Sequence, residues 1–203
     1  MTLKAWYVQL RLMKHYIIAS AIVFLAGGAI GYFYPEMFRA LMDSKINQLQ
    51  DVAKQLVESE HKQLYTFLFI FTNNTVLSIL MMYAGMLFGL IPLYFLVTNG
   101  MILGYLASYN ETGDKWFLFA KGIAPHGIIE IPAIVLACAF GLRFGFLLLE
   151  AIASLPSAAR RERVRNKAYS FMKATIPMMG VIAVLLLAAA VIESTLTMWL
   201  MGK

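Results

Sequence analysis

Long apolar runs separated by short polar stretches dominate the chain, and five of these runs are long enough to cross a bilayer as helices. A membrane-spanning helix needs about 20 mainly apolar residues, because the hydrocarbon core is about 30 Å thick and each residue adds about 1.5 Å. The five runs cover residues 16–34, 64–90, 92–109, 126–149 and 175–200. We therefore predict an all-α fold, in which residues 1–203 form a single membrane domain with five transmembrane helices.

Residues 36–62 follow a different pattern, with charged residues of both signs and an apolar residue at every third or fourth position. This spacing places the apolar side chains on one face of a helix. The resulting apolar stripe comprises Met42, Ile46, Leu49, Ala53 and Leu56. We predict an amphipathic helix outside the membrane. Its stripe either packs on the membrane surface or on its own bundle, or docks a partner protein or a second copy of the chain.

A short stretch before the fourth span, residues 116–123, is aromatic and apolar but too short to cross the membrane. It follows a polar loop at 110–115 and ends close to Pro125. Proline suits the first turn of a helix, where its missing N–H is no loss. We therefore expect the fourth transmembrane helix to begin near Pro125. Residues 116–123 should form a separate interfacial or re-entrant segment.

The composition agrees with a membrane protein, since 61% of the residues are hydrophobic and 14% are charged, with a mean hydropathy of +0.72. Soluble domains have about 45–50% apolar and about 25% charged residues. The single cysteine, Cys138, lies inside the fourth span, so the chain contains no internal disulfide. The sequence has no phosphate-binding glycine-rich loop and no paired-histidine zinc motif, and we predict no cofactor.

The net charge of +6 is concentrated between the fourth and fifth spans. Against one glutamate, this stretch contains the basic residues Arg160, Arg161, Arg163, Arg165, Lys167 and Lys173. Short loops rich in lysine and arginine stay in the cytoplasm. We therefore predict a basic cytoplasmic loop at 154–174, which contacts anionic lipid rather than nucleic acid. Residues 1–15 then also lie in the cytoplasm, whereas residues 36–62 and the C-terminus lie outside it.

Glycines recur at a spacing of four residues inside four of the predicted spans. Small residues at this spacing allow helix backbones to approach closely in a membrane. The pairs are Gly27 and Gly31, Gly85 and Gly89, Gly100 and Gly104, and Gly141 and Gly145. Together they predict a tight bundle in which most of the spans take part in a close helix–helix contact.

A small set of polar and ionisable residues interrupts the spans, and such residues are costly in lipid unless they face protein or water. The set comprises Asn73, Asn74, Asn99, His126, Glu130 and Glu193. We expect a structural hydrogen-bond cluster around Glu130, with the asparagines and His126 as its candidate partners. Two other interpretations stay open. One is a metal or catalytic site, which needs at least one ligand beyond His126 and Glu130, and the other is a path for ions or protons.

These polar residues and glycines occur in an order that resembles the stage II sporulation protein M family. The motifs are Asn73-Asn74, Asn99-Gly100-x-x-x-Gly104, Pro125-His126-Gly127-x-x-Glu130-x-Pro132-Ala133 and Gly141-Leu142-Arg143-x-Gly145, followed by Glu193 in the last span. The resemblance implies a non-enzymatic scaffold in the septal and engulfing membrane of a spore-forming cell. There it would localise stage II sporulation proteins D and P, which degrade peptidoglycan.

Two alternatives belong to other functional classes. The first is a small transporter or channel that uses the Asn/His/Glu residues, and the second is an intramembrane metal-dependent enzyme. A scaffold predicts a dry, fully paired polar cluster and an exposed apolar stripe on 36–62. A transporter predicts a water-connected cavity that reaches Glu130, and an enzyme predicts a metal with three or more ligands.

The predicted orientation is testable with single cysteines in a variant that lacks Cys138. Because the basic stretch holds its end of the chain in the cytoplasm, Gln48→Cys should react with a membrane-impermeant thiol reagent in intact cells. Ser157→Cys should react only after the cells are opened, which serves as the control for its reactivity. The reverse labelling pattern would establish the opposite orientation.

Overall fold

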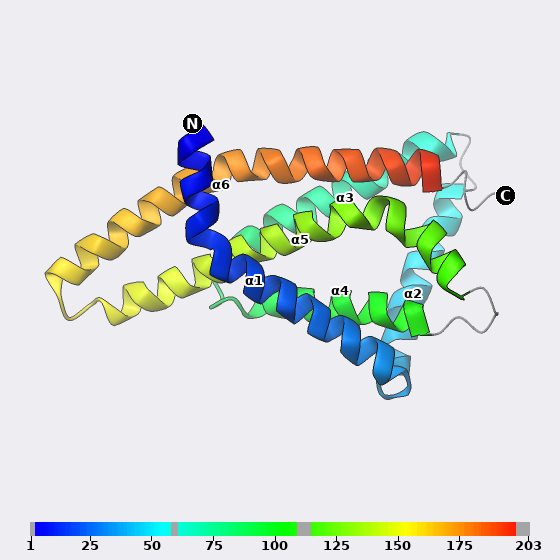
Figure 1. Ribbon diagram of the computed structural model, residues 1–203, viewed down its shortest axis with the longest axis horizontal. Helices are drawn as coiled ribbons and strands as arrows, with labels where there is room; N and C mark the ends of the chain where they lie inside the picture. The colour runs from blue at the N-terminus through cyan, green and yellow to red at the C-terminus, as the bar shows by residue number, and fades with distance from the viewer. Residues whose placement is uncertain (1–2, 58–60, 109–114, 198–203) are drawn as a thin grey trace.

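The computed structural model describes residues 3–57, 61–108 and 115–197, and within these ranges it consists of helices joined by short turns (Figure 1). The elements are α1 (Leu3–Phe33), α2 (Pro35–Val57), α3 (Lys62–Ala84), α4 (Leu90–Ser108), α5 (Lys115–Ala153), α6 (Ala158–Ile192) and the π-helical turn η1 (Glu193–Thr197). No strand occurs among these described residues. The predicted all-α fold is confirmed.

Within the described part of the chain, five stretches are long and apolar enough to cross a membrane, as the sequence predicts. They are Leu10–Phe33 in α1, Gln63–Ala84 in α3, Leu90–Ser108 in α4, Gly127–Ala153 in α5, and Ala158–Leu196 in α6 and η1. The helix α2 is not one of them, because it carries charges of both signs. It runs across one end of the bundle between α1 and α3 (Figure 1). The chain is therefore a multi-pass membrane protein with one additional amphipathic helix.

The expected helix start near Pro125 and the separate segment at 116–123 are wrong, because residues 116–123 form the first turns of α5. Pro125 and Pro132 both lie inside this helix, and its first turns bend away from the rest (Figure 1). A proline removes one backbone hydrogen bond and kinks a helix. Starting a new helix would instead expose several unsatisfied backbone N–H groups. A bent continuous helix therefore costs less than two separate elements at the edge of the membrane.

The basic stretch at 154–174 is also helical rather than a loop. The chain turns at 154–157, and α6 then begins at Ala158 and includes every one of the basic residues named above. Between Ala158 and Ile176 the sequence has neither glycine nor proline, and it is rich in alanine, arginine and lysine, which favour helices. The end of α5 and the start of α6 form a helical hairpin that extends beyond the other helices (Figure 1).

Glycines bring α1 and α4 into backbone contact. The residues at this crossing are Gly27, Gly31, Gly100 and Gly104. A Cβ atom added at Gly31 would overlap the carbonyl group of Met101, and one added at Gly100 would overlap the carbonyl oxygen of Phe24. Any larger side chain at these positions would force the two helices apart. The α1–α4 contact is the most extensive between any two described helices.

A second close crossing joins the turn at 85–89 to α5. It is formed by Gly85, Gly89, Gly141 and Gly145. A Cβ atom at Gly85 would overlap the backbone of Gly141. Gly85 and Gly89 were expected inside a span, but α3 ends at Ala84 and they lie in the turn before α4. Gly89 has a φ of +79°, in the left-handed region that glycine adopts without strain.

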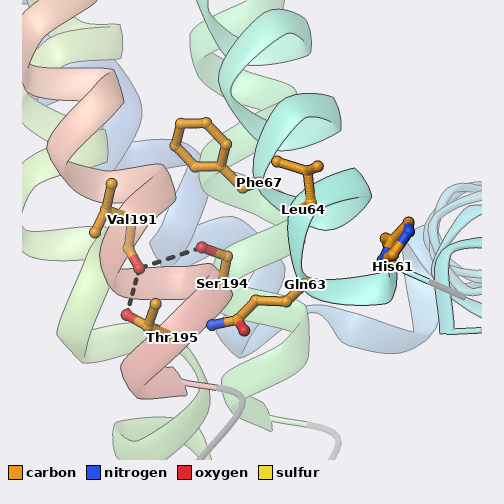
Figure 2. Close-up of a pocket in the computed structure, with 7 residues that line it drawn as sticks. All are labelled: His61, Gln63, Leu64, Phe67, Val191, Ser194 and Thr195. Atoms are coloured by element: carbon orange, nitrogen blue, oxygen red, sulfur yellow. Dashed lines mark hydrogen bonds between the residues drawn. The ribbon is translucent and has the colours of Figure 1, made fainter.

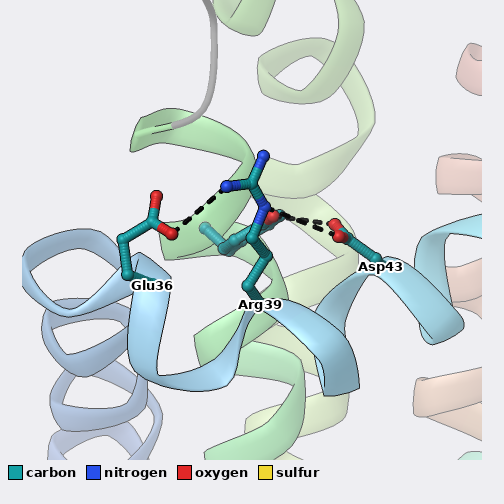
Figure 3. A network of polar contacts seen from close by, with 4 residues as sticks. Glu36, Arg39 and Asp43 are labelled. Carbon is teal, nitrogen blue, oxygen red and sulfur yellow. Dashed lines mark hydrogen bonds and ion pairs between the residues drawn. The ribbon is translucent and has the colours of Figure 1, made fainter.

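The first half of α2 is fixed to the end of α4. Met42 is fully buried against Met101 and Tyr105. The hydroxyl of Tyr105 donates a hydrogen bond of 2.7 Å to Oδ1 of Asp43. Arg39 lies between two carboxylates, 3.2 Å from Glu36 and 3.8 Å from Asp43 (Figure 3). Met42 therefore packs inside its own chain and is not available to a partner.

The other four members of the apolar stripe, Ile46, Leu49, Ala53 and Leu56, have side chains outside the described part of the structure. Their backbone belongs to α2, so they share one helical face as the spacing predicts. The docking role of this part of the stripe stays a prediction.

The α1–α4 crossing can be tested by comparing two glycines that both lie inside spans. Gly100→Leu should lower the free energy of unfolding by at least about 1–3 kcal/mol, because overpacking strains the helix contact. Gly180→Leu is the matched control, since no atom lies within 4 Å of a Cβ atom placed there. Midpoints of thermal unfolding in detergent measure both effects. Equal midpoints for the two variants would show that the crossing is not tight.

Candidate functional site

Three elements meet where α3, α5 and η1 pack together near one end of the bundle. Asn74, on α3, donates a hydrogen bond of 2.7 Å from Nδ2 to Oε1 of Glu130 on α5. The neighbouring Asn73 donates from Nδ2 to Oδ1 of Asn74 at 3.3 Å. A chain of amide and carboxyl groups thus links two helices whose hydrogen-bonded residues are 56 positions apart. We call Asn73, Asn74, Glu130 and Glu193 the acid–amide cluster.

Glu193 brings a second carboxyl group to this cluster. It is the first residue of η1, and its carboxyl lies close enough to that of Glu130 for an electrostatic interaction. A π-helical turn widens the helix by one residue and is found frequently at functional sites. Here the wider turn follows directly on α6 and packs against α5, and Glu193 is its first residue. Two acids from different helices therefore approach one another inside the spanning region.

The physical chemistry of this cluster restricts what it does. An ionised carboxyl in an apolar span is costly unless it is hydrogen-bonded or faces water. The amide of Asn74 supplies one such bond to Glu130. A cluster of this kind serves as a structural link between helices, or it holds a proton or a cation. Among the described residues, no group of three or more histidine, cysteine, aspartate or glutamate side chains is placed to share a metal.

Two residues predicted for the cluster have a different outcome. Asn99 is not joined to it by a hydrogen bond, because its Nδ2 donates to the backbone oxygen of Phe95 on its own helix at 2.8 Å. Gly100, the next residue on α4, faces α1. Neighbouring residues on a helix point about 100° apart, so the side chain of Asn99 points away from that contact. The side chain of His126 lies outside the described part of the structure, although its backbone belongs to α5.

A cavity of about 670 Å³ opens between the start of α3 and the end of α6 (Figure 2). It is lined by His61, Gln63, Leu64, Phe67, Val191, Ser194 and Thr195. The hydroxyl groups of Ser194 and Thr195 both donate to the backbone oxygen of Val191. The sequence did not predict this cavity, because its two walls are distant along the chain. The only local signal was the polar pair that follows Glu193.

Arg143 is a further ionisable residue inside a span; it belongs to the Gly141-Leu142-Arg143-x-Gly145 motif but was not predicted as a site residue. Its guanidinium group lies 5.4 Å from the centre of the Phe171 ring, a cation–π distance. One terminal nitrogen, Nη1, is buried without a hydrogen-bond partner among the described residues. Along α5, Arg143 is separated from Glu130 by roughly 20 Å at the helical rise. The arginine therefore cannot neutralise the acid–amide cluster. An isolated arginine between two glycines of an apolar span was the signal that could have identified it.

Comparisons with known proteins cover nearly the whole molecule. The family model described as Stage II sporulation protein M matches residues 20–198. An uncharacterised protein of Methanocaldococcus jannaschii is 24% identical over 188 residues, which span 91% of this chain and 82% of that protein. Another uncharacterised protein of the same organism is 29% identical over 135 residues, which span 66% of this chain and 70% of that protein. No solved structure matches the chain.

The role of Glu130 is testable by two substitutions of similar size. Glu130→Gln should keep the fold and the function, because a glutamine oxygen still accepts the hydrogen bond from Asn74. Glu130→Leu removes the acceptor and leaves the half-buried Nδ2 of Asn74 without this hydrogen bond, which should cost about 1–3 kcal/mol of unfolding free energy. Unfolding in detergent and complementation of a deletion strain measure the two properties.

A double-mutant cycle provides the control for this experiment. Asn74→Leu combined with Glu130→Leu should cost less than the sum of the single changes, because the two residues share one hydrogen bond. A Glu130→Gln variant that folds normally but fails to complement would refute the structural role. It would assign the carboxyl to ion or proton binding instead.

Proposed function

The chain belongs to the stage II sporulation protein M family, and on this basis we propose that it is a membrane scaffold for peptidoglycan-degrading proteins. The proposed location is the septal and engulfing membrane of a sporulating cell. The proposed partners are stage II sporulation proteins D and P, which the resemblance of its motifs to this family implies. The supporting facts are that the chain is a multi-pass membrane protein and that its match to the family, residues 20–198, includes α2, the last four spans and the second half of the first span.

The observation that carries the proposal is the position of α2. This helix is too polar to be one of the membrane spans, yet its first half is held against α4 by Met42 and the Asp43–Tyr105 hydrogen bond. Its second half continues across the end of the bundle (Figure 1). A polar helix that lies across the end of its own bundle, outside the membrane spans, is suited to present a surface to another protein.

We propose further that α2 lies outside the cytoplasm. The supporting argument is the concentration of arginine and lysine at the start of α6, which favours a cytoplasmic position for the α5–α6 hairpin. Figure 1 shows α2 and this hairpin at opposite ends of the bundle. With the hairpin inside the cell, α2 faces the space in which peptidoglycan is made and degraded.

Transport of protons or cations is a second candidate, and one observation favours it. The carboxyl groups of Glu130 and Glu193 are within range of an electrostatic interaction, and Ser194 and Thr195, which follow Glu193, line the 670 Å³ cavity. Paired acids inside a membrane are typical of proton and ion pathways. The Glu130→Gln variant separates this candidate from the scaffold, because a scaffold does not need an ionisable group at that position.

The scaffold proposal is tested by placing charges on the second half of α2. Ile46→Glu with Leu49→Glu should abolish recruitment of the partners, because two carboxylates would have to be buried in the docking surface. Recruitment is measured by crosslinking to the partners and by imaging a fluorescently labelled protein D or P in sporulating cells.

The matched control adds the same charge to the same part of α2. Asn47→Asp with Gln48→Glu changes two exposed positions beside the stripe and should leave recruitment unchanged. Both variants should accumulate in the membrane and elute from size-exclusion chromatography as the parent does. Normal recruitment by the Ile46→Glu and Leu49→Glu variant would reject the stripe as a docking surface.

A further inference from the structure

The hairpin of α5 and α6 carries a groove that the scaffold proposal does not use. It is a cavity of about 370 Å³ between the last turns of α5 and the first turns of α6. Its walls are mainly apolar and include Phe144, Leu147, Leu148, Leu155, Phe171 and Met172. Pockets that bind small molecules have volumes of about 300–1,000 Å³ and are also largely apolar. We call this cavity the apolar groove.

Two arginines line the same groove. Arg161 and Arg165 are one helical turn apart on α6, so their side chains emerge on the same face. Arg165 is paired with Glu162 at 4.0 Å, but both side chains are exposed, at 78% and 68%. An exposed ion pair of this length contributes little free energy. The guanidinium groups therefore keep their capacity to bind an anion beside the apolar walls.

The opposite side of the hairpin has a different character. A second cavity of about 320 Å³ is lined by Arg160, Arg163 and Lys167 together with Glu150. Lys167 already binds Glu150 at 2.8 Å, and Nε of Arg163 donates to a backbone oxygen at 3.4 Å. Ser154 and Val164 line both cavities, so the line of contact between the two helices separates them. Only the first of the two combines cations with extended apolar walls.

We propose that the apolar groove binds an anionic phospholipid, with one acyl chain along its walls and the phosphate on Arg161 and Arg165. Guanidinium groups bind phosphate through paired, charge-assisted hydrogen bonds. The acyl chain gains free energy by contact with the apolar walls, which a free phosphate ion cannot use. A zwitterionic lipid carries its own cation beside the phosphate and competes poorly for two arginines. Basic pockets between transmembrane helices bind acidic lipid headgroups in this way.

The site does not depend on the scaffold proposal, because it uses neither α2 nor the acid–amide cluster. It also does not depend on the orientation of the chain, since it requires only that the hairpin lie at the surface of a membrane that contains anionic lipid. The exposed side chains of Leu149, Ile152 and Leu155, at 45%, 55% and 62%, are consistent with a hairpin in contact with lipid.

The test uses the full chain, purified in detergent and mixed with phosphatidylglycerol or phosphatidylcholine of identical acyl chains. Native mass spectrometry measures the dissociation constant of the first bound lipid. Phosphatidylglycerol should bind about tenfold or more tightly than phosphatidylcholine. Arg161→Gln with Arg165→Gln should weaken phosphatidylglycerol binding about tenfold or more, the factor expected for loss of charge-assisted hydrogen bonds.

A matched control removes the same charge from the same hairpin. Arg160→Gln with Arg163→Gln alters only the second cavity, so it should change the dissociation constant by less than about threefold. Equal losses for the two double variants would replace the specific site with diffuse attraction and overturn the proposal. Displacement of the lipid by an equal concentration of inorganic phosphate would likewise overturn it, because the site would then recognise phosphate alone.

A third variant examines the acyl chain. Ala168 lines the apolar groove, and Ala168→Phe fills it without altering charge. This variant should bind phosphatidylglycerol about tenfold more weakly while its helical circular dichroism is unchanged. If the Ala168→Phe variant does not fold, Ala151→Phe fills the groove from α5 instead, and its affinity for phosphatidylglycerol is measured in the same way. Unchanged lipid binding by a folded groove-filling variant would exclude the acyl chain from the groove and overturn the proposal.

Discussion

Backbone contact at the glycine crossings is the constraint on which the rest of this bundle depends. Inside a bilayer, apolar side chains gain little by leaving lipid for protein, so close packing has to supply much of the attraction between helices. At Gly31 and Gly100 the backbones are so close that no Cβ atom fits. This contact places the end of α4, and that end in turn supplies Met101 and Tyr105, on which α2 is docked. A change in the α1–α4 crossing is therefore also a change in the position of α2.

The second crossing has a comparable effect on the polar residues. Gly85 and Gly141 hold the end of α3 against the middle of α5, which sets the rotation of both helices. With this rotation, the amide of Asn74 on α3 reaches the carboxyl of Glu130 on α5. Glu130 of the acid–amide cluster and Arg143 are both on α5, and the helical rise separates them by about 20 Å along the helix. Glu130 and Arg143, which carry opposite charge when ionised, are thus kept apart: Glu130 accepts a hydrogen bond from an amide, and Arg143 lies against an aromatic ring.

The two ends of the bundle differ in chemistry as a result. One end carries α2 with its Glu36–Arg39–Asp43 network, where charges of both signs neutralise one another. The other carries the α5–α6 hairpin, whose arginines and lysines outnumber its acids. Such an asymmetry suits a protein that contacts anionic lipid at one end and another protein at the other. The molecule joins these ends by five spans that contain few polar groups.

The all-α class, the five spans and the amphipathic α2 could all be predicted from the sequence, because each is a local pattern within a single stretch of chain. The sequence also predicted a polar cluster around Glu130 and close helix contacts at the paired glycines. Three features became visible only in the packed helices: Asn74 bonds to Glu130, Asn99 bonds to its own helix, and Arg161 and Arg165 line an apolar groove. These features depend on which helices are neighbours and on how each is rotated about its axis. Helix periodicity does not contain that information, whereas the backbone contacts at the glycine crossings do.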